Sequence, residues 1–159
     1  MNFRNLDLES VTEITFSENS YGTEACQWIT DNVLKKAVNL QKVDFSDMFT
    51  ARLRSDLPKS LAILMSGLDV NKIVDLNLSH NAFGPDGVKS FEQFLKFASN
   101  LKVLNVTNCG LGPAGSSMIA EAILENENMK LTELYACRDR LEEEGMESFS
   151  RVFAKHKSI

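Results

Sequence analysis

The chain has 159 residues, the size of a single domain, with 17 lysine and arginine residues against 22 aspartate and glutamate residues and a formal net charge of −5. This acidic balance argues against a broad electropositive face, so we expect no nucleic-acid partner. The composition is 43% hydrophobic and 25% charged, as in globular chains, and the sequence contains no apolar run of membrane-spanning length. We therefore expect no membrane partner.

An internal repeat organises the predicted elements. A motif of alternating apolar residues followed by a polar turn begins near residues 14, 43, 76, 104 and 134, at intervals of 29, 33, 28 and 30 residues. Such an interval accommodates one strand and one helix, as in the long form of the leucine-rich repeat. The sequence predicts an α/β fold over residues 1–159 in a single domain, a right-handed β/α superhelix of about five repeats shaped as an arc.

Residues 1–10 precede the first repeat, and we expect them to form an N-terminal cap or an edge strand. A helix should follow each strand, starting at Pro85 in the third repeat and at Pro113 in the fourth, because proline is tolerated in the first helical turn. Apolar residues at helical spacing mark the face that each helix should bury. They are Ala25, Trp28, Ile29, Val33, Leu61, Met65, Leu68, Val88, Phe91, Leu95, Met118, Ala122, Met146, Phe149 and Phe153.

Side chains alternate along each strand, so the pattern leucines should face the core while the residues between them, Asn77 among them, line the concave wall. Asparagine at the sixth pattern position commonly bonds to the backbone of stacked turns. Here Met48 occupies that position in the second repeat and cannot form these bonds, so we expect this repeat to be irregular. The longest interval also falls here, after the carboxyl end of a parallel strand, where function tends to lie.

Metal and cofactor chemistry has no support in the residue spacing. Cys26, Cys109 and Cys137 are odd in number and fit neither a zinc site nor a redox pair, and His80 has no carboxylate or thiol partner at ligand spacing. We expect reduced thiols, no metal site and no resident cofactor. The N-terminus carries no apolar signal segment. We expect a cytoplasmic protein, with the nuclear envelope as an alternative location.

The last helix is followed by residues 156–159 without a recognisable capping repeat. A solenoid end without a cap exposes apolar surface and a strand edge. We therefore expect self-association through the C-terminal edge.

Three stretches resemble the leucine-rich-repeat domain of the GTPase-activating proteins of the small GTPase Ran, with this chain similar to its N-terminal half. The first is Asp44–Pro58, in which a phenylalanine, a threonine and a small residue precede Arg52; the family usually has glycine in place of Ala51. The second is Leu76–Pro85, continued in Leu104–Pro113. The third is Arg138–Glu142, where the family prefers asparagine in place of Asp139.

The resemblance implies an activator that binds Ran in its GTP form without being a hydrolase itself; GTP and magnesium would be bound by the GTPase. In this family the GTPase's own glutamine orients the attacking water, and no arginine finger is inserted. Asn108 matches the asparagine that helps fix this glutamine, and Arg52 matches the arginine required for full activity. Asp47, Arg54, Asn77, His80 and Arg138 are the candidate partner-binding residues.

Two other functions remain open from the sequence. Leucine-rich repeats serve many unrelated binding roles, so a non-catalytic protein-interaction scaffold is the alternative from a different class. The chain could also be an inactive fragment of an activator, because the family's repeat domain is longer than this chain.

Overall fold

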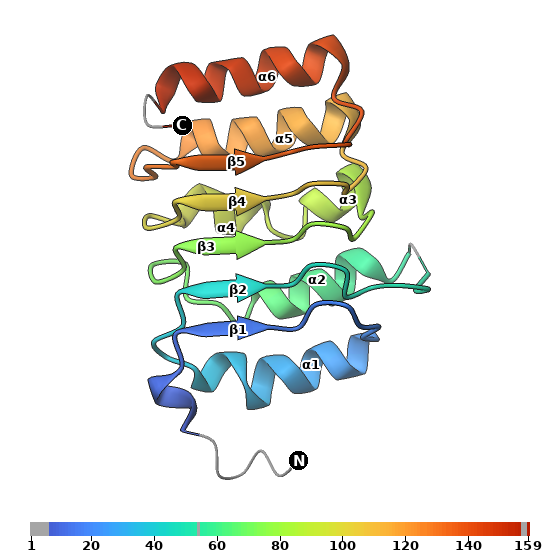
Figure 1. Ribbon diagram of the computed structural model, residues 1–159, viewed down its shortest axis with the longest axis vertical. Helices are drawn as coiled ribbons and strands as arrows, with labels where there is room; N and C mark the ends of the chain where they lie inside the picture. Colours follow the sequence, from blue (N-terminus) through green and yellow to red (C-terminus); the bar gives the residue numbers. More distant parts are fainter. Residues whose placement is uncertain (1–6, 54, 157–158) are drawn as a thin grey trace.

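Five short strands form one parallel sheet in chain order (Figure 1). The strands are β1 (Glu13–Thr15), β2 (Lys42–Asp44), β3 (Asp75–Asn77), β4 (Val103–Asn105) and β5 (Glu133–Tyr135). Their central residues pair in register from Ile14 through Val43, Leu76 and Leu104 to Leu134, which are the five motif positions. The computed structural model describes residues 7–53, 55–156 and 159.

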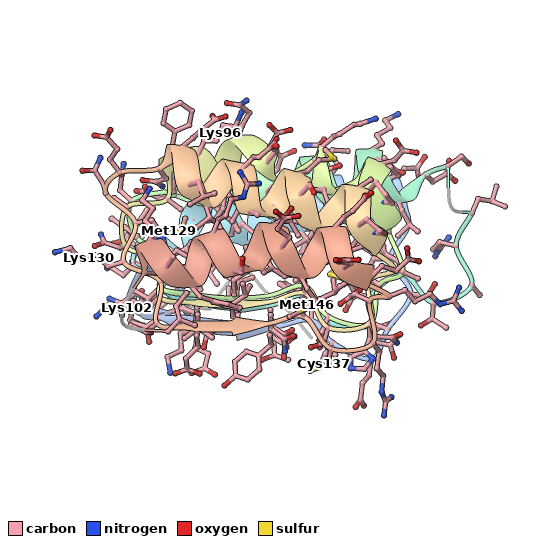
Figure 2. All side chains as sticks on the ribbon, turned by 90° about the horizontal axis from the view of Figure 1, so that it is seen from above. Lys96, Lys102, Met129, Lys130, Cys137 and Met146 are labelled. Carbon is pink, nitrogen blue, oxygen red and sulfur yellow. The ribbon has the colours of Figure 1, made fainter. Side chains whose placement is uncertain are left out.

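The α-helices lie on one side of this sheet (Figure 2). The helical elements are η2 (Leu8–Ser10), α1 (Thr23–Asn32), η3 (Leu34–Lys36), α2 (Leu57–Met65), α3 (Gly84–Val88), α4 (Glu92–Phe97), α5 (Gly112–Glu125) and α6 (Glu142–Lys155). Pro85 and Pro113 lie in the first turns of α3 and α5, so the predicted helix starts are confirmed. The repetition of one strand and one helical layer confirms the leucine-rich-repeat fold.

The core lies between sheet and helices, and equivalent residues of successive repeats stack in rows. One row precedes the strands and consists of Leu40, Ile73, Leu101 and Leu131; another follows the strand centres and consists of Phe45, Leu78 and Val106. Each fully buried side chain of this size stabilises the fold by about 1.5–3 kcal/mol. Because each row crosses several repeats, the stacking of the units depends on these residues.

Five expectations need correction. Trp28 is 47% exposed, and Ala25, Met146 and Phe153 are also exposed, although helical spacing placed all four on buried faces. Ala25 and Trp28 lie on α1, which packs against α2, whereas Met146 and Phe153 lie on α6, which packs against α5. A residue at a flank of the stack can satisfy the helical period and still face outward. The single helix expected in the third repeat is divided into α3 and α4.

The N-terminal segment differs in part from its expected form. Residues 8–10 form the 3₁₀ helix η2, so an edge strand is wrong for these residues. Residues 1–6 lie outside the described residues. Within the part of the chain that the structure describes, no helix has both the length and the apolar character required to cross a bilayer.

The repeats are also joined through the sixth pattern position. The buried side chain of Asn81 accepts a hydrogen bond from the backbone N–H of Met48 at 3.0 Å through Oδ1. Its Nδ2 donates to the carbonyl oxygens of Phe45 at 2.7 Å and Leu78 at 2.9 Å. Asn81 therefore supplies, from the following repeat, the contacts that Met48 cannot make. Because the backbone N–H of Met48 has this partner, the Met48 side chain is fully buried in the core.

Candidate functional site at the carboxyl ends of the strands

A row of left-handed residues runs along the carboxyl ends of the strands. Glu18, Asp47, His80, Asn108 and Arg138 occupy the same pattern position in the five repeats, and their φ angles all lie between 46° and 62°. This conformation ends the strand and turns the chain toward its helix. Since neighbouring strands are about 4.8 Å apart, the row presents one side chain at each step of the stack. We call this row, together with Arg52, the rim.

Four candidate residues, at one position of the sequence pattern, thus share one backbone conformation. His80, Asn108 and Arg138 are exposed, whereas Asp47 is half-buried. Such a backbone conformation costs about 1–2 kcal/mol for a residue with a side chain. Short polar residues tolerate it better than most, which explains Asp47 and Asn108 but not Arg138.

Two neighbouring rim residues contact each other. Nδ2 of Asn108 lies 3.2 Å from Nδ1 of His80. If the amide nitrogen donates, the imidazole accepts at Nδ1 and carries its proton on Nε2. The Asn108 carboxamide is then held on one side, and its oxygen is free to accept a hydrogen bond from a partner. His80 lies in the turn after β3, and Asn108 lies in the turn after β4. They come into contact because the carboxyl ends of neighbouring parallel strands lie side by side at one edge of the sheet.

Asp47 has a local role in the loop that follows β2. Its Oδ1 accepts a hydrogen bond from the Thr50 hydroxyl at 2.7 Å. This contact closes the start of the loop, which projects beyond the turns of the other repeats (Figure 1). Asp47 is therefore occupied in shaping the loop that carries Arg52. Ala51, immediately before Arg52, is exposed and left-handed with φ of 59°.

The guanidinium of Arg52 lies against the turn of the preceding repeat. Its Nε donates to Ser20 Oγ at 3.0 Å, and its Nη2 donates to the Ser20 carbonyl oxygen, also at 3.0 Å. Arg52 is exposed and is not packed into the core. None of the ion pairs among the described residues includes Arg52, so its positive charge is not neutralised by a carboxylate there.

Asn77 belongs to the concave wall rather than to the rim. Its Oδ1 accepts a hydrogen bond from the Ser79 backbone N–H at 3.1 Å, and Asn105 forms the same contact with Thr107 at 3.0 Å. Its carboxamide oxygen therefore stabilises a turn, although the residue lines a shallow hollow of about 610 Å³ on the concave side. Arg54, the remaining candidate, lies outside the described residues.

The concave hollow is charged. It is lined by Glu13, Lys42, Asp44, Asp75 and Glu133, with Tyr135 beside them. Partial burial raises the pKa of the Asp75 carboxyl, and the neighbouring carboxylates act in the same direction while Lys42 opposes them. Tyr135 donates its hydroxyl proton to Glu133 at 2.6 Å. The wall thus presents polar groups that differ from those of the rim.

No metal site accompanies these surfaces. Among the residues that the structure describes, no three histidine, cysteine, aspartate or glutamate side chains are grouped so that they could hold a metal ion. Cys26 and Cys109 are buried, and burial raises the pKa of their thiols to about 11 and about 12. These thiols remain protonated near neutral pH. Cys137 is exposed at the strand ends, opposite Lys102 and Lys130 (Figure 2).

Ser20 contacts the rim residue Arg52 and was not identified from the sequence. It lies in the first copy of the motif, and only its separation from Arg52 by about one repeat could have suggested the contact. The tertiary stacking of two turns is what brings the two residues together.

Comparisons with known proteins agree with this architecture. A family model described as Leucine Rich repeat matches residues 71–91 and 98–120. A solved structure, Leiomodin-1 Actin-Binding Site 2, superposes with a TM-score of 0.66 over 93% of this chain and 82% of that chain. Its sequence identity is 16%, so it shows the fold alone. The chain has a leucine-rich-repeat fold.

Its relatives are more specific. The chain is 35% identical to Ran GTPase-activating protein 1 of Xenopus laevis over 92% of this chain and 27% of that protein. It is 33% identical to the Ran GTPase-activating protein of Drosophila melanogaster, over 94% and 27% respectively. The Saccharomyces cerevisiae Ran GTPase-activating protein 1 is 31% identical over 85% and 36%. The chain is thus related over most of its length to a part of the Ran GTPase-activating proteins.

The chain spans 27% to 36% of the length of these relatives. The resemblance stated from the sequence is confirmed at the level of this relationship.

Proposed function

We propose that the chain binds a Ran-like small GTPase in its GTP form through the rim and accelerates GTP hydrolysis without being a hydrolase itself. The observation that carries the proposal is the placement of Arg52 and Asn108 beyond the carboxyl ends of β2 and β4, at the same edge of the stack, where both are exposed. The relationship to Ran GTPase-activating proteins supports the identity of the partner. The location expected from the sequence, the cytoplasm or the nuclear envelope, stays a prediction.

Asn108 is the residue that we assign to the GTPase's catalytic glutamine. Its contact with His80 fixes the orientation of the carboxamide, so a free oxygen is presented to a donor on the partner. An amide that holds the glutamine of the GTPase lowers the cost of positioning the attacking water, which is the main source of rate in this chemistry. Arg52 contributes a positive charge at the same edge of the stack, held against the turn of the first repeat.

Hydrolysis of GTP by Ran, with the chain in catalytic amounts, tests this proposal. We expect acceleration by the intact chain and a loss of about tenfold or more in Arg52→Ala and in Asn108→Ala, since each removes a positioned polar group. Lys130→Ala is the matched control, because it removes an exposed cation at the opposite end of the strands (Figure 2). If the intact chain gives no acceleration, the proposal is wrong.

The second candidate function is a non-catalytic interaction scaffold. The observation that favours it is the hollowed, charged concave wall, which is separate from the rim. Binding experiments with Ran distinguish the two functions. An activator should bind the GTP state in preference to the GDP state and should lose this preference in Arg52→Ala. A scaffold that uses the concave wall should instead respond to Asp75→Lys and not to changes at the rim.

A further inference from the structure

The first repeat holds the side chain of Arg52, although the motif around Arg52 belongs to the second repeat. We propose that Ser20 and Gly22 are positioning residues that fix the Arg52 guanidinium on the rim. This inference rests on the proposed function for its consequence. The contacts on which it is built belong to the chain itself.

The Ser20 hydroxyl is oriented by a second contact. Its Oγ donates to the carbonyl oxygen of Thr50 at 2.6 Å. A hydroxyl has a single proton, so the lone pairs of Ser20 Oγ are left to accept from Arg52 Nε. The carbonyl oxygen of Ser20 accepts from Nη2 in parallel. Two nitrogens of the guanidinium therefore donate hydrogen bonds to two acceptors on the same residue, Ser20.

The turn that carries Ser20 is itself attached to the second repeat. Ser20 forms an isolated antiparallel bridge with Phe49. The Asn19 N–H donates to the Asp47 carbonyl oxygen, and the Tyr21 N–H donates to the Met48 carbonyl oxygen, both at 3.0 Å. These backbone contacts fix the acceptor before any partner binds, so the position of Arg52 is preorganised.

Gly22 leaves room for the guanidinium. A Cβ atom at this position would lie 3.3 Å from Nη1 and 3.5 Å from Cζ of Arg52. The glycine therefore lets the planar group lie close to the backbone at the start of α1. A methyl group there would press against the guanidinium and displace it by a few tenths of an ångström.

The two acceptors, the hydroxyl and the carbonyl oxygen of Ser20, carry no charge. They hold the guanidinium without cancelling its charge, and Arg52 as a residue stays exposed. Arginine held in this way can meet a carboxylate or a carbonyl acceptor on the bound GTPase with little loss of side-chain entropy. The binding site for the partner thus extends into the first repeat.

Nuclear magnetic resonance of the Arg52 Nε–H group directly tests the hydrogen bond to Ser20. We expect slow exchange of this proton with water in the intact chain and in Ser20→Thr, which keeps the hydroxyl. Exchange should be several-fold faster in Ser20→Ala, because a hydrogen bond to a charged group is lost. Ser55→Ala removes an exposed hydroxyl of the same loop and should leave the exchange rate unchanged. An unchanged rate in Ser20→Ala overturns the inference.

Kinetics test the consequence. With Ran as substrate, Ser20→Ala should lower the rate at saturating GTPase by about three- to tenfold, with recovery in Ser20→Thr. Gly22→Ala should act in the same direction. In the Arg52→Ala background, Ser20→Ala should have no further effect. Independent, multiplying effects would overturn the positioning role. A chain that is inactive with Ran contradicts the proposed function, while the exchange experiment still decides whether Ser20 positions Arg52.

Discussion

Left-handed backbone positions are the clearest local strain in the molecule. Ala51 adopts φ of 59° in the loop that carries Arg52, where the related family usually has glycine. Glycine reaches this region without a steric penalty because it has no Cβ atom. The structure thus gives a physical reason for the glycine, and it places the strain beside the candidate site.

Ala51→Gly should stabilise the chain by about 0.5–1 kcal/mol, since the relief of left-handed strain exceeds the added entropy of the unfolded chain. Urea unfolding measures this difference. Ala62→Gly is the matched control, because Ala62 is exposed in the middle of α2 and glycine destabilises a helix by about 1 kcal/mol. The same substitution should therefore have opposite signs at the two positions, and equal signs would contradict the assignment.

Asp139 is a buried carboxyl group at the position that Asn81 occupies two repeats earlier. Its Oδ1 accepts from the Cys109 N–H at 2.7 Å and from the Leu111 N–H at 3.3 Å. Its Oδ2 is buried and has no hydrogen-bond partner among the described residues. The equivalent atom of Asn81 is Nδ2, which donates two hydrogen bonds to backbone carbonyl oxygens. Burial raises the pKa of Asp139, since the charged form is disfavoured there.

This raised pKa makes stability depend on pH. The pKa of an aspartate in the unfolded chain is about 3.9, so the folded state retains the proton over a range above that value. Stability should then fall as the pH rises from about 3.9 through the folded pKa, and the full penalty applies above it. Asp139→Asn should remove this contribution and raise the free energy of unfolding at pH 7 by about 1–3 kcal/mol.

Urea unfolding of both chains across this pH range measures the effect, and the gain should shrink as the pH is lowered. Asp69→Asn, at an exposed position, is the control and should leave stability nearly unchanged. A gain in Asp139→Asn that is the same at every pH would contradict the role of ionisation.

At the scale of the element, the turns between strand and helix are joined by side chains from the next repeat. Asn81 provides the acceptor for Met48 and donates to Phe45, so the third repeat completes the turn of the second. The second repeat is consequently irregular in its long loop while its buried turn remains fully paired. The expected irregularity thus lies in the inserted residues that carry Arg52.

Asn81→Leu should destabilise the chain by about 3 kcal/mol or more, because the Met48 N–H and two carbonyl oxygens lose partners in a buried environment. Chemical unfolding measures the loss. Asn19→Leu is the control at the same pattern position, where the exposed side chain accepts, among the residues that the structure describes, only from the adjacent Ser20 N–H. Its effect should stay below about 1 kcal/mol. Equal effects would show that the contact between repeats is unimportant.

At the scale of the whole molecule, apolar side chains are exposed on the outer flank of α6. Met146 is 53% exposed and Phe153 is 41% exposed. Exposed apolar residues at one flank of a solenoid favour association. We propose that this flank mediates the self-association expected from the sequence.

Light scattering across a range of concentrations tests this proposal. The apparent mass should rise with concentration for the intact chain and should remain that of a monomer in the double variant Met146→Glu and Phe153→Glu. Phe97→Glu, which changes an exposed aromatic residue on α4, should leave the association intact. A monomer at the highest concentration of the intact chain would contradict the proposal.

Sequence periodicity was sufficient for the architecture, because a strand and a helix repeated in one sense have few ways to bury their apolar faces. The positions of the five strands, the helix starts at Pro85 and Pro113, and the rim location of Asn108 and Arg52 follow from that constraint.

The contacts between one repeat and the next were determined by the way the repeats stack. Asn81 beneath Met48, Ser20 beside Arg52, and the outward face of Trp28 depend on which turn lies next to which. These residues are separated along the chain by about one repeat or lie at a flank, and local patterns carry no information on contacts at such a distance. Only the assembled stack places a hydroxyl from one turn where the guanidinium of the next can reach it.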